Sequence, residues 1–137
     1  MSDVYLFRDQ LQSLIQRALE SSNVSQENAL SVAAALTQAQ IDGQVGHGIS
    51  RVASYCAQAR SGKVHGHATP HIAAETASAL RIDAQHGFAF PAIDLAIKEL
   101  PNKAKSMGLR RRRSSARITL VSPAGMLNVW RCKTLWD

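Results

Sequence analysis

Three residues whose side chains can bind ligands or transfer protons recur at every fourth position: His47, Arg51 and Tyr55. If His47 lies at the N-terminal edge of a helix, all three share one face, because successive members are displaced by only about 40°. Arg51 can hold a carboxylate through two parallel N–H donors, Tyr55 can hydrogen-bond an oxygen atom, and His47 can transfer a proton near neutral pH. On spacing alone, a solvated helix face that carries three polar residues is the simpler interpretation.

Glycines surround this group. Gly46 and Gly48 flank His47, and Gly43 precedes them. Because glycine has no Cβ atom, it lets another backbone or a cofactor ring approach closely. The three glycines are not a dinucleotide-binding fingerprint, since no strand precedes them and the GxGxxG spacing is absent. The segment therefore predicts a tight, backbone-rich loop.

No metal site is expected. His65, His67 and His71 lie in a polar loop without cysteine or carboxylate partners at ligand spacing, so they are interpreted as solvated histidines. Cys56 and Cys132 form neither a disulfide framework nor a paired metal spacing, and both are interpreted as reduced thiols.

Hydrophobic periodicity indicates the elements that position these residues. Ser25 is a suitable N-cap for the second helix, and Gly62 ends the third. Pro91 fits the first turn of a fourth helix, which Pro101 is expected to kink or end. Helices are expected over residues 5–20, 26–41, 49–60 and beyond 91, and a half-buried strand over 79–84.

The charge of the chain is concentrated at one end. Residues 1–109 contain nine basic and nine acidic residues, whereas residues 110–137 contain seven basic residues and one acidic residue and so carry the whole net charge of +6. Both tryptophans also lie in this last stretch. No apolar run is long enough to cross a membrane, and the charged N-terminus is unlike a secretory signal. A cytoplasmic protein without membrane contact is therefore expected.

The ordered series of an acidic residue and Gly43, then His47-Gly48, Arg51 and Tyr55, resembles the N-terminal signature of the malate/L-lactate dehydrogenase family, which includes ureidoglycolate, sulfolactate and diketogulonate reductases. The resemblance covers residues 7–109 and implies hydride transfer between NAD or NADP and a 2-hydroxy or 2-oxo acid such as malate, lactate or ureidoglycolate. It continues through Gly62, the Pro70 region, LRIDA with Gly87 behind it, and KAKSMGL.

By this resemblance, His47 is a catalytic position, Arg51 and Tyr55 bind the substrate, and Gly46 and His47 contact the cofactor. One departure is that the family usually has Ser before the His, where this chain has Gly46 and so lacks a hydroxyl. The implied fold is α/β: an N-terminal helical subdomain followed by the start of a mixed, non-Rossmann NAD(P)-binding sheet. The parent enzyme is expected to be a homodimer.

Three regions are expected: a helical segment with the His-Gly-x-x-Arg motif (1–70), the beginning of the cofactor-binding α/β domain (71–109) and an aberrant basic tail (110–137). The family's His-His-x-Gly segment is missing. Read one base out of frame, with third bases chosen to fit, residues 117–131 can encode HHAGLAGWHVERLA, which contains this motif. We therefore predict a frameshift near codons 109–113 and a truncated, inactive fragment.

Two functions of other classes stay open. The first is a small basic protein that binds nucleic acid through Arg110–Arg113. No nucleic-acid partner is expected, however, because the tail lacks interleaved aromatic residues and the neutral body offers no basic face. The second is a helical interaction module that pairs with another subunit through its apolar faces.

Overall fold

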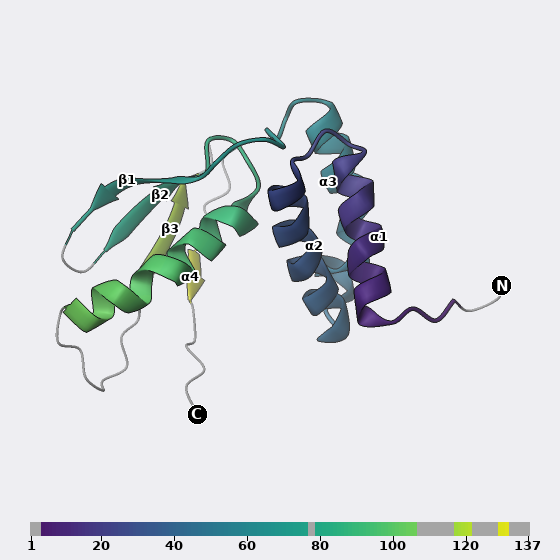
Figure 1. Cartoon of the computed structure of the whole chain (residues 1–137), viewed down its shortest axis with the longest axis horizontal. Coiled ribbons are helices and arrows are strands. Elements are labelled where there is room, and N and C mark those ends of the chain that lie inside the picture. The colour runs from purple at the N-terminus through teal and green to yellow at the C-terminus, as the bar shows by residue number, and fades with distance from the viewer. Residues whose placement is uncertain (1–3, 77–78, 107–116, 122–128, 132–137) are drawn as a thin grey trace. The chain divides into compact units, whose positions relative to one another are not determined.

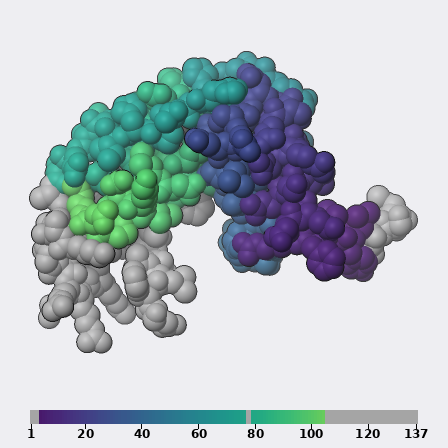
Figure 2. All heavy atoms as spheres, in the orientation of Figure 1, coloured from purple at the N-terminus to yellow at the C-terminus, as the bar shows by residue number. Residues whose placement is uncertain are grey.

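The computed structural model describes residues 4–76, 79–106, 117–121 and 129–131. The chain divides into two compact units, Met1–His67 (unit 1) and Ala68–Asp137 (unit 2), which are described separately (Figures 1 and 2). The predicted change of reading frame at codons 109–113 lies outside the described residues.

Unit 1 consists of helices and short 3-10 turns: α1 (Arg8–Glu20), α2 (Gln26–Ile41), η1 (Val45–His47), η2 (Ile49–Arg51) and α3 (Val52–Arg60). α1 packs against both α2 and α3 (Figure 1). The predicted N-cap of α2 is confirmed, because the Ser25 side chain accepts a hydrogen bond from the amide of Asn28 at 3.4 Å. α3 ends at Arg60, and Gly62 just beyond it has a φ of 73°, which glycine adopts without steric cost.

The core of unit 1 lies mainly between α1 and α2. Ala29 and Ala33 are fully buried on α2 and allow close approach of the neighbouring helix. Leu30 is 48% exposed, because it follows Ala29 by about 100° around the helix and so leaves the buried face. The buried apolar residues of the unit are Ile15, Leu19, Val24, Ala29, Val32, Ala33, Leu36, Cys56 and Ala59.

Unit 2 contains a mixed sheet with a helix packed on it (Figure 1). Its strands are β1 (His71–Glu75), β2 (Leu80–Asp83), β3 (Arg117–Val121) and β4 (Val129–Arg131), in the order β1-β2-β3-β4. β2 and β3 are parallel, whereas the two outer pairs are antiparallel. The expected mixed sheet after a helical segment is thus confirmed. Two segments of the basic tail contribute strands to it, although no periodicity marked them in the sequence.

Helix α4 (Ala89–Ser106) covers β2 through a small buried cluster of Ile82, Ala84, Ala92 and Ala96. Pro91 lies in the first turn of α4, as predicted. Of the two outcomes expected at Pro101, a kink or an end of the helix, the end is wrong, since α4 continues to Ser106. Pro101 removes one main-chain hydrogen bond, the one to the carbonyl of Ile97. Because Ile97 is 56% exposed, water can solvate that part of the helix.

Strand β1 has no counterpart among the expected elements. All of its residues are exposed, so no alternation of apolar and polar side chains marks it in the sequence. It forms because its main chain pairs with β2, with Ile72 opposite Ile82 and an irregularity between Ile72 and Ala74.

Candidate functional site

The candidate site residues lie in one continuous stretch of unit 1, from η1 to α3. Arg51 ends η2 and is the N-cap of α3, and its backbone is already right-handed helical (φ −85°, ψ −18°). Tyr55 lies in α3, one turn later. Arg51 and Tyr55 therefore follow one another along one side of a helical segment. Arg51 is exposed and Tyr55 is half-buried.

His47 does not belong to this helical segment. It is the last residue of η1, and Gly48 after it leaves the helical region with φ −95° and ψ −129°. The three side chains could share one helix face only if His47 lay at the N-terminal edge of the helix. Because His47 lies on η1 and Gly48 interrupts the helical conformation, the three do not share such a face. His47 stands instead on a separate, exposed turn in front of the helix.

Hydrogen bonds tie this turn to the helix that follows it. The Nε of Arg51 donates to the carbonyl oxygen of Gly46 at 2.6 Å. The hydroxyl of Ser50 donates to the carbonyl oxygen of Val45 at 2.6 Å. The amide of His47 donates to the carbonyl oxygen of Gln44 at 2.8 Å. Arg51 is thus bonded to the residue beside His47, so a side-chain hydrogen bond to the turn, rather than helical spacing, holds the two positions together.

A residue of α2 that the sequence did not indicate also contacts this turn. The side-chain Oε1 of Gln40 accepts a hydrogen bond from the amide of Ile49 at 3.2 Å. Gly48 is buried against the same side chain: a Cβ atom there would collide with Oε1 of Gln40 and lie 3.0 Å from its Cα. No sequence pattern marks Gln40, because this contact depends on how α2 packs against the turn.

The edge of the turn formed by Gly46 and His47 is accessible. A Cβ atom at Gly46 would meet no atom within 4 Å among the described residues, and His47 next to it is exposed. A flat ring can therefore approach the backbone at this point. Gly46 and His47, the two positions at which a cofactor contact is expected from the sequence, are therefore both accessible in this turn.

Three further histidines were considered from the sequence as possible metal ligands. His65 and His67 are exposed, and a ring nitrogen of His67 lies 3.3 Å from Oδ1 of Asn23. His71 belongs to β1 of unit 2 and is also exposed. Within the described part of the chain, no group of three or more His, Cys, Asp or Glu side chains is arranged to hold a metal ion. None of the helices described there is both long and apolar enough to cross a membrane.

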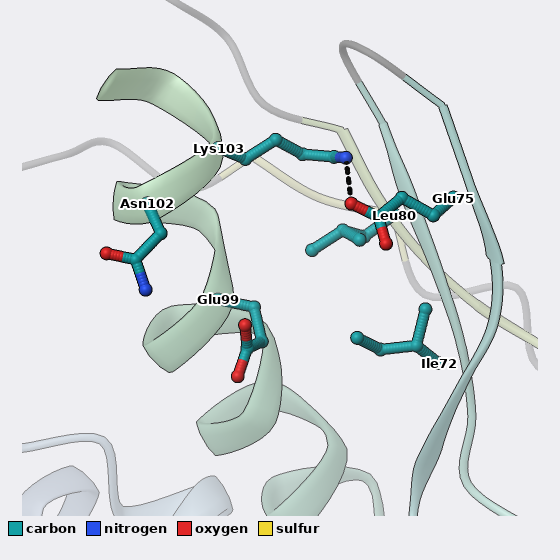
Figure 3. A pocket seen from close by; sticks show the side chains of 6 residues that line it. All are labelled: Ile72, Glu75, Leu80, Glu99, Asn102 and Lys103. Atoms are coloured by element: carbon teal, nitrogen blue, oxygen red, sulfur yellow. Dashed lines mark hydrogen bonds and ion pairs between the residues drawn. The ribbon is translucent and has the colours of Figure 1, made fainter. Parts of the chain in front are cut away.

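A groove of about 260 Å³ lies between α4 and the β1–β2 hairpin of unit 2 (Figure 3). Lys103 reaches from α4 to Glu75 of β1, with 2.5 Å between Nζ and Oε1. The groove is lined by two carboxylates, those of Glu75 and Glu99, and by one ammonium group, that of Lys103. Because negative charges outnumber positive ones, the groove is unfavourable for an anionic substrate. It contains none of the expected site residues, and its lining consists of Ile72, Glu75, Leu80, Glu99, Asn102 and Lys103.

Comparison with known proteins identifies relatives for most of the chain. Residues 7–110 match the family model described as malate/L-lactate dehydrogenase. The (2R)-3-sulfolactate dehydrogenase (NADP(+)) of Chromohalobacter salexigens is 41% identical over 98 residues, which are 72% of this chain and 29% of that protein. The Delta(1)-pyrroline-2-carboxylate reductase of Ancylobacter novellus is 36% identical over 96 residues, which are 70% of this chain and 28% of the reductase.

Solved structures show the same relationship in three dimensions. The delta1-piperideine-2-carboxylate reductase from Pseudomonas syringae pv. tomato superimposes with a TM-score of 0.75 and 32% identity, over 86% of this chain and 34% of that chain. The malate dehydrogenase from Pyrococcus horikoshii superimposes with a TM-score of 0.72 and 27% identity, over 85% and 32%. The chain thus spans less than a third of the length of the two curated relatives.

Proposed function

Because the chain belongs to the malate/L-lactate dehydrogenase family, we propose that residues 7–109 are the part of an NAD(P)-dependent oxidoreductase that binds the acid substrate. Members of the family are oxidoreductases that act on CH–OH or CH–NH groups. The relatives named above act on a 2-hydroxy acid or on a cyclic imine, and both substrates carry a carboxylate on the carbon that changes oxidation state. The proposed substrate is accordingly a small acid with C=O or C=N at C2 in its oxidised form.

One observation carries this proposal: Arg51 is an exposed residue, and its guanidinium group is bonded to the turn that holds His47. A carboxylate bound by Arg51 would therefore lie close to His47, because Gly46 adjoins His47. The carboxylate would bind the terminal nitrogens of Arg51, since the Nε–H already donates to Gly46.

The remaining roles follow from the reaction. His47 would transfer a proton to or from the oxygen or nitrogen atom on C2, and Tyr55 would orient that atom by a hydrogen bond. A reduced nicotinamide, when bound, supplies a hydride to C2. Gly46 and His47 would leave room for its ring, as their accessible edge allows. The cofactor is NAD or NADP.

We further propose that the 137-residue chain alone is an inactive, truncated form of a cytoplasmic and homodimeric parent enzyme, with a frameshift near codons 109–113. Two observations support this proposal. The chain covers only 28% and 29% of the lengths of the two curated relatives, and its composition becomes strongly basic from Arg110 onward. An active site assembled from several chain segments cannot be preorganised when most of them are missing. Neither nucleic acid nor a membrane is proposed as a partner.

A chimaera tests the proposed substrate site. Residues 7–109 would replace the matching N-terminal part of the Pseudomonas syringae reductase, and oxidation of NADPH and NADH would be followed with Delta(1)-pyrroline-2-carboxylate, delta1-piperideine-2-carboxylate and 2-oxo acids. We expect saturable turnover of at least one acid, lost in the Arg51→Met chimaera. A folded chimaera that binds NAD(P)H but reduces none of these acids would refute the proposal.

A further inference from the structure

We propose that Gln40 is a positioning residue of this site: from α2, its side-chain oxygen caps the helical segment that begins at Ile49 and so sets the place of the His47 turn. That this turn takes part in a substrate site rests on the proposed function, whereas the contact between Gln40 and Ile49 does not. Gln40 would act through the main chain and would not touch substrate or cofactor.

This helical segment needs a cap that its own N-cap residue cannot provide. The first N–H groups of a helix have no carbonyl partner within it, and Ser, Thr, Asp or Asn at the N-cap usually accepts from one of them. The N-cap of η2 is Gly48, which has no side chain. Gln40, nine residues earlier, accepts the hydrogen bond from Ile49 instead. The cap therefore comes from a neighbouring helix.

Gly48 and Gln40 also fit together sterically. Gly48 has a φ of −95°, so a left-handed conformation does not explain the glycine at this position. The close approach of α2 does, because a Cβ atom at position 48 would lie 3.0 Å from both Cα and Cβ of Gln40 and would collide with its Oε1. The absence of a side chain at Gly48 thus leaves the space that the side chain of Gln40 occupies.

The contact of Gln40 with Ile49 also connects the His47 turn to α2. The turn is bonded to the helix by Arg51 and Ser50, which donate to the carbonyl oxygens of Gly46 and Val45. Gln40 bonds the same assembly to α2 at Ile49, between the turn and Arg51. If Ile49 moves relative to α2, the segment with Gly46, His47 and Arg51 moves with it. Loss of the Gln40 oxygen should therefore change the surroundings of His47 without any contact between the two side chains.

The test uses the intact 137-residue chain, with amide hydrogen exchange and NMR spectra of the His47 ring. Gln40→Ala removes the acceptor, whereas Gln40→Glu keeps an oxygen at the same reach. Gln38→Ala is the matched control, because Gln38 lies on the same helix and bonds to Arg8 and Asp42 instead of the turn. We expect Gln40→Ala to accelerate exchange of the Ile49 amide by about three- to tenfold relative to the Val32 amide and to shift the His47 ring signals. Gln40→Glu should restore both readouts, and Gln38→Ala should change neither.

Three results would overturn the proposal: an unchanged Ile49 amide in Gln40→Ala, equal acceleration at Ile49 and Val32, or a Gln40→Glu variant that behaves like Gln40→Ala. Equal acceleration would mean that Gln40 only stabilises the unit as a whole. These measurements need no substrate or cofactor. A failed chimaera assay would therefore refute the proposed function and leave the Gln40 contact standing, and failure here would leave the chimaera result standing.

Discussion

The Nε–H of Arg51 donates a hydrogen bond to the carbonyl oxygen of Gly46, 2.6 Å away. An arginine side chain can donate hydrogen bonds to the protein and to a ligand at the same time, because its planar guanidinium group carries five N–H donors in a fixed fork. With Nε bound to the turn, the end of the guanidinium group with the two terminal nitrogens is the side suited to a bidentate carboxylate. Lysine could not reproduce this, since its donors radiate from one nitrogen atom.

Replacing Arg51 by Met in the chimaera should raise KM for the acid substrate. Loss of a charge-assisted bidentate contact costs about 2–4 kcal/mol, which corresponds to a decrease of about 30- to 1000-fold in kcat/KM. Steady-state kinetics at varied acid concentration measure the effect, and Arg51→Lys should recover only a minor part of it. If Arg51→Met leaves KM unchanged, the carboxylate is bound elsewhere.

Replacing His47 by Ala should lower kcat/KM of the chimaera by about 10²- to 10⁴-fold, the usual contribution of a positioned acid or base. His71→Ala is a suitable control, because His71 is an exposed residue of β1 in the other unit. NAD(P)H oxidation by both variants provides the comparison. Equal activity of the His47 and His71 variants would rule out proton transfer by His47.

Gly48→Ala should destabilise the chain by about 1–3 kcal/mol, because the added Cβ atom overpacks the contact with Gln40. Gly46→Ala is the matched control: it adds the same methyl group two residues earlier, where the described residues leave space. Urea unfolding of the two variants beside the unchanged chain measures the difference. A Gly46 variant as destabilised as the Gly48 variant would show that backbone flexibility, rather than space, accounts for both glycines.

The purified 137-residue chain should show no NAD(P)H oxidation with any 2-oxo acid or cyclic imine. The residues described here supply the proposed acid-binding positions, but the relatives they match are more than three times as long as the matched region. Activity is measured in parallel with the chimaera, which serves as the positive control. Saturable turnover by the chain alone would show that it contains a complete active site.

The gene sequence should reveal a reading-frame change near codons 109–113. The composition changes abruptly there, and residues 117–131 can be read out of frame as a His-His-x-Gly segment followed by a helix-like sequence. Sequencing the gene from independent isolates is the measurement. An early stop in the shifted frame, or an unrelated sequence in it, would mean that the basic tail belongs to the gene as read.

Local chemistry determines where several elements of unit 1 begin and end, independently of tertiary contacts. The start of α2 at Ser25 could be predicted because an N-cap bond joins residues three apart, and the end of α3 before Gly62 because glycine tolerates positive φ. The spacing of His47, Arg51 and Tyr55 alone did not indicate a function, but the ordered series of motifs over residues 7–109 suggested the family that the comparisons then showed. The catalytic and binding roles of these three residues remain predictions.

Other features depended on contacts between residues distant in the sequence. β1 exists through main-chain pairing with β2, which its exposed side chains do not encode. The helix continues past Pro101, since the cost of one lost hydrogen bond depends on whether water can reach the freed carbonyl. His47 stands on its own turn, because the packing of α2 leaves no room for a side chain at Gly48 and brings the Gln40 oxygen to Ile49. Sequence alone thus determined which residues were candidates, whereas their arrangement depended on the close packing of two segments that no local pattern describes.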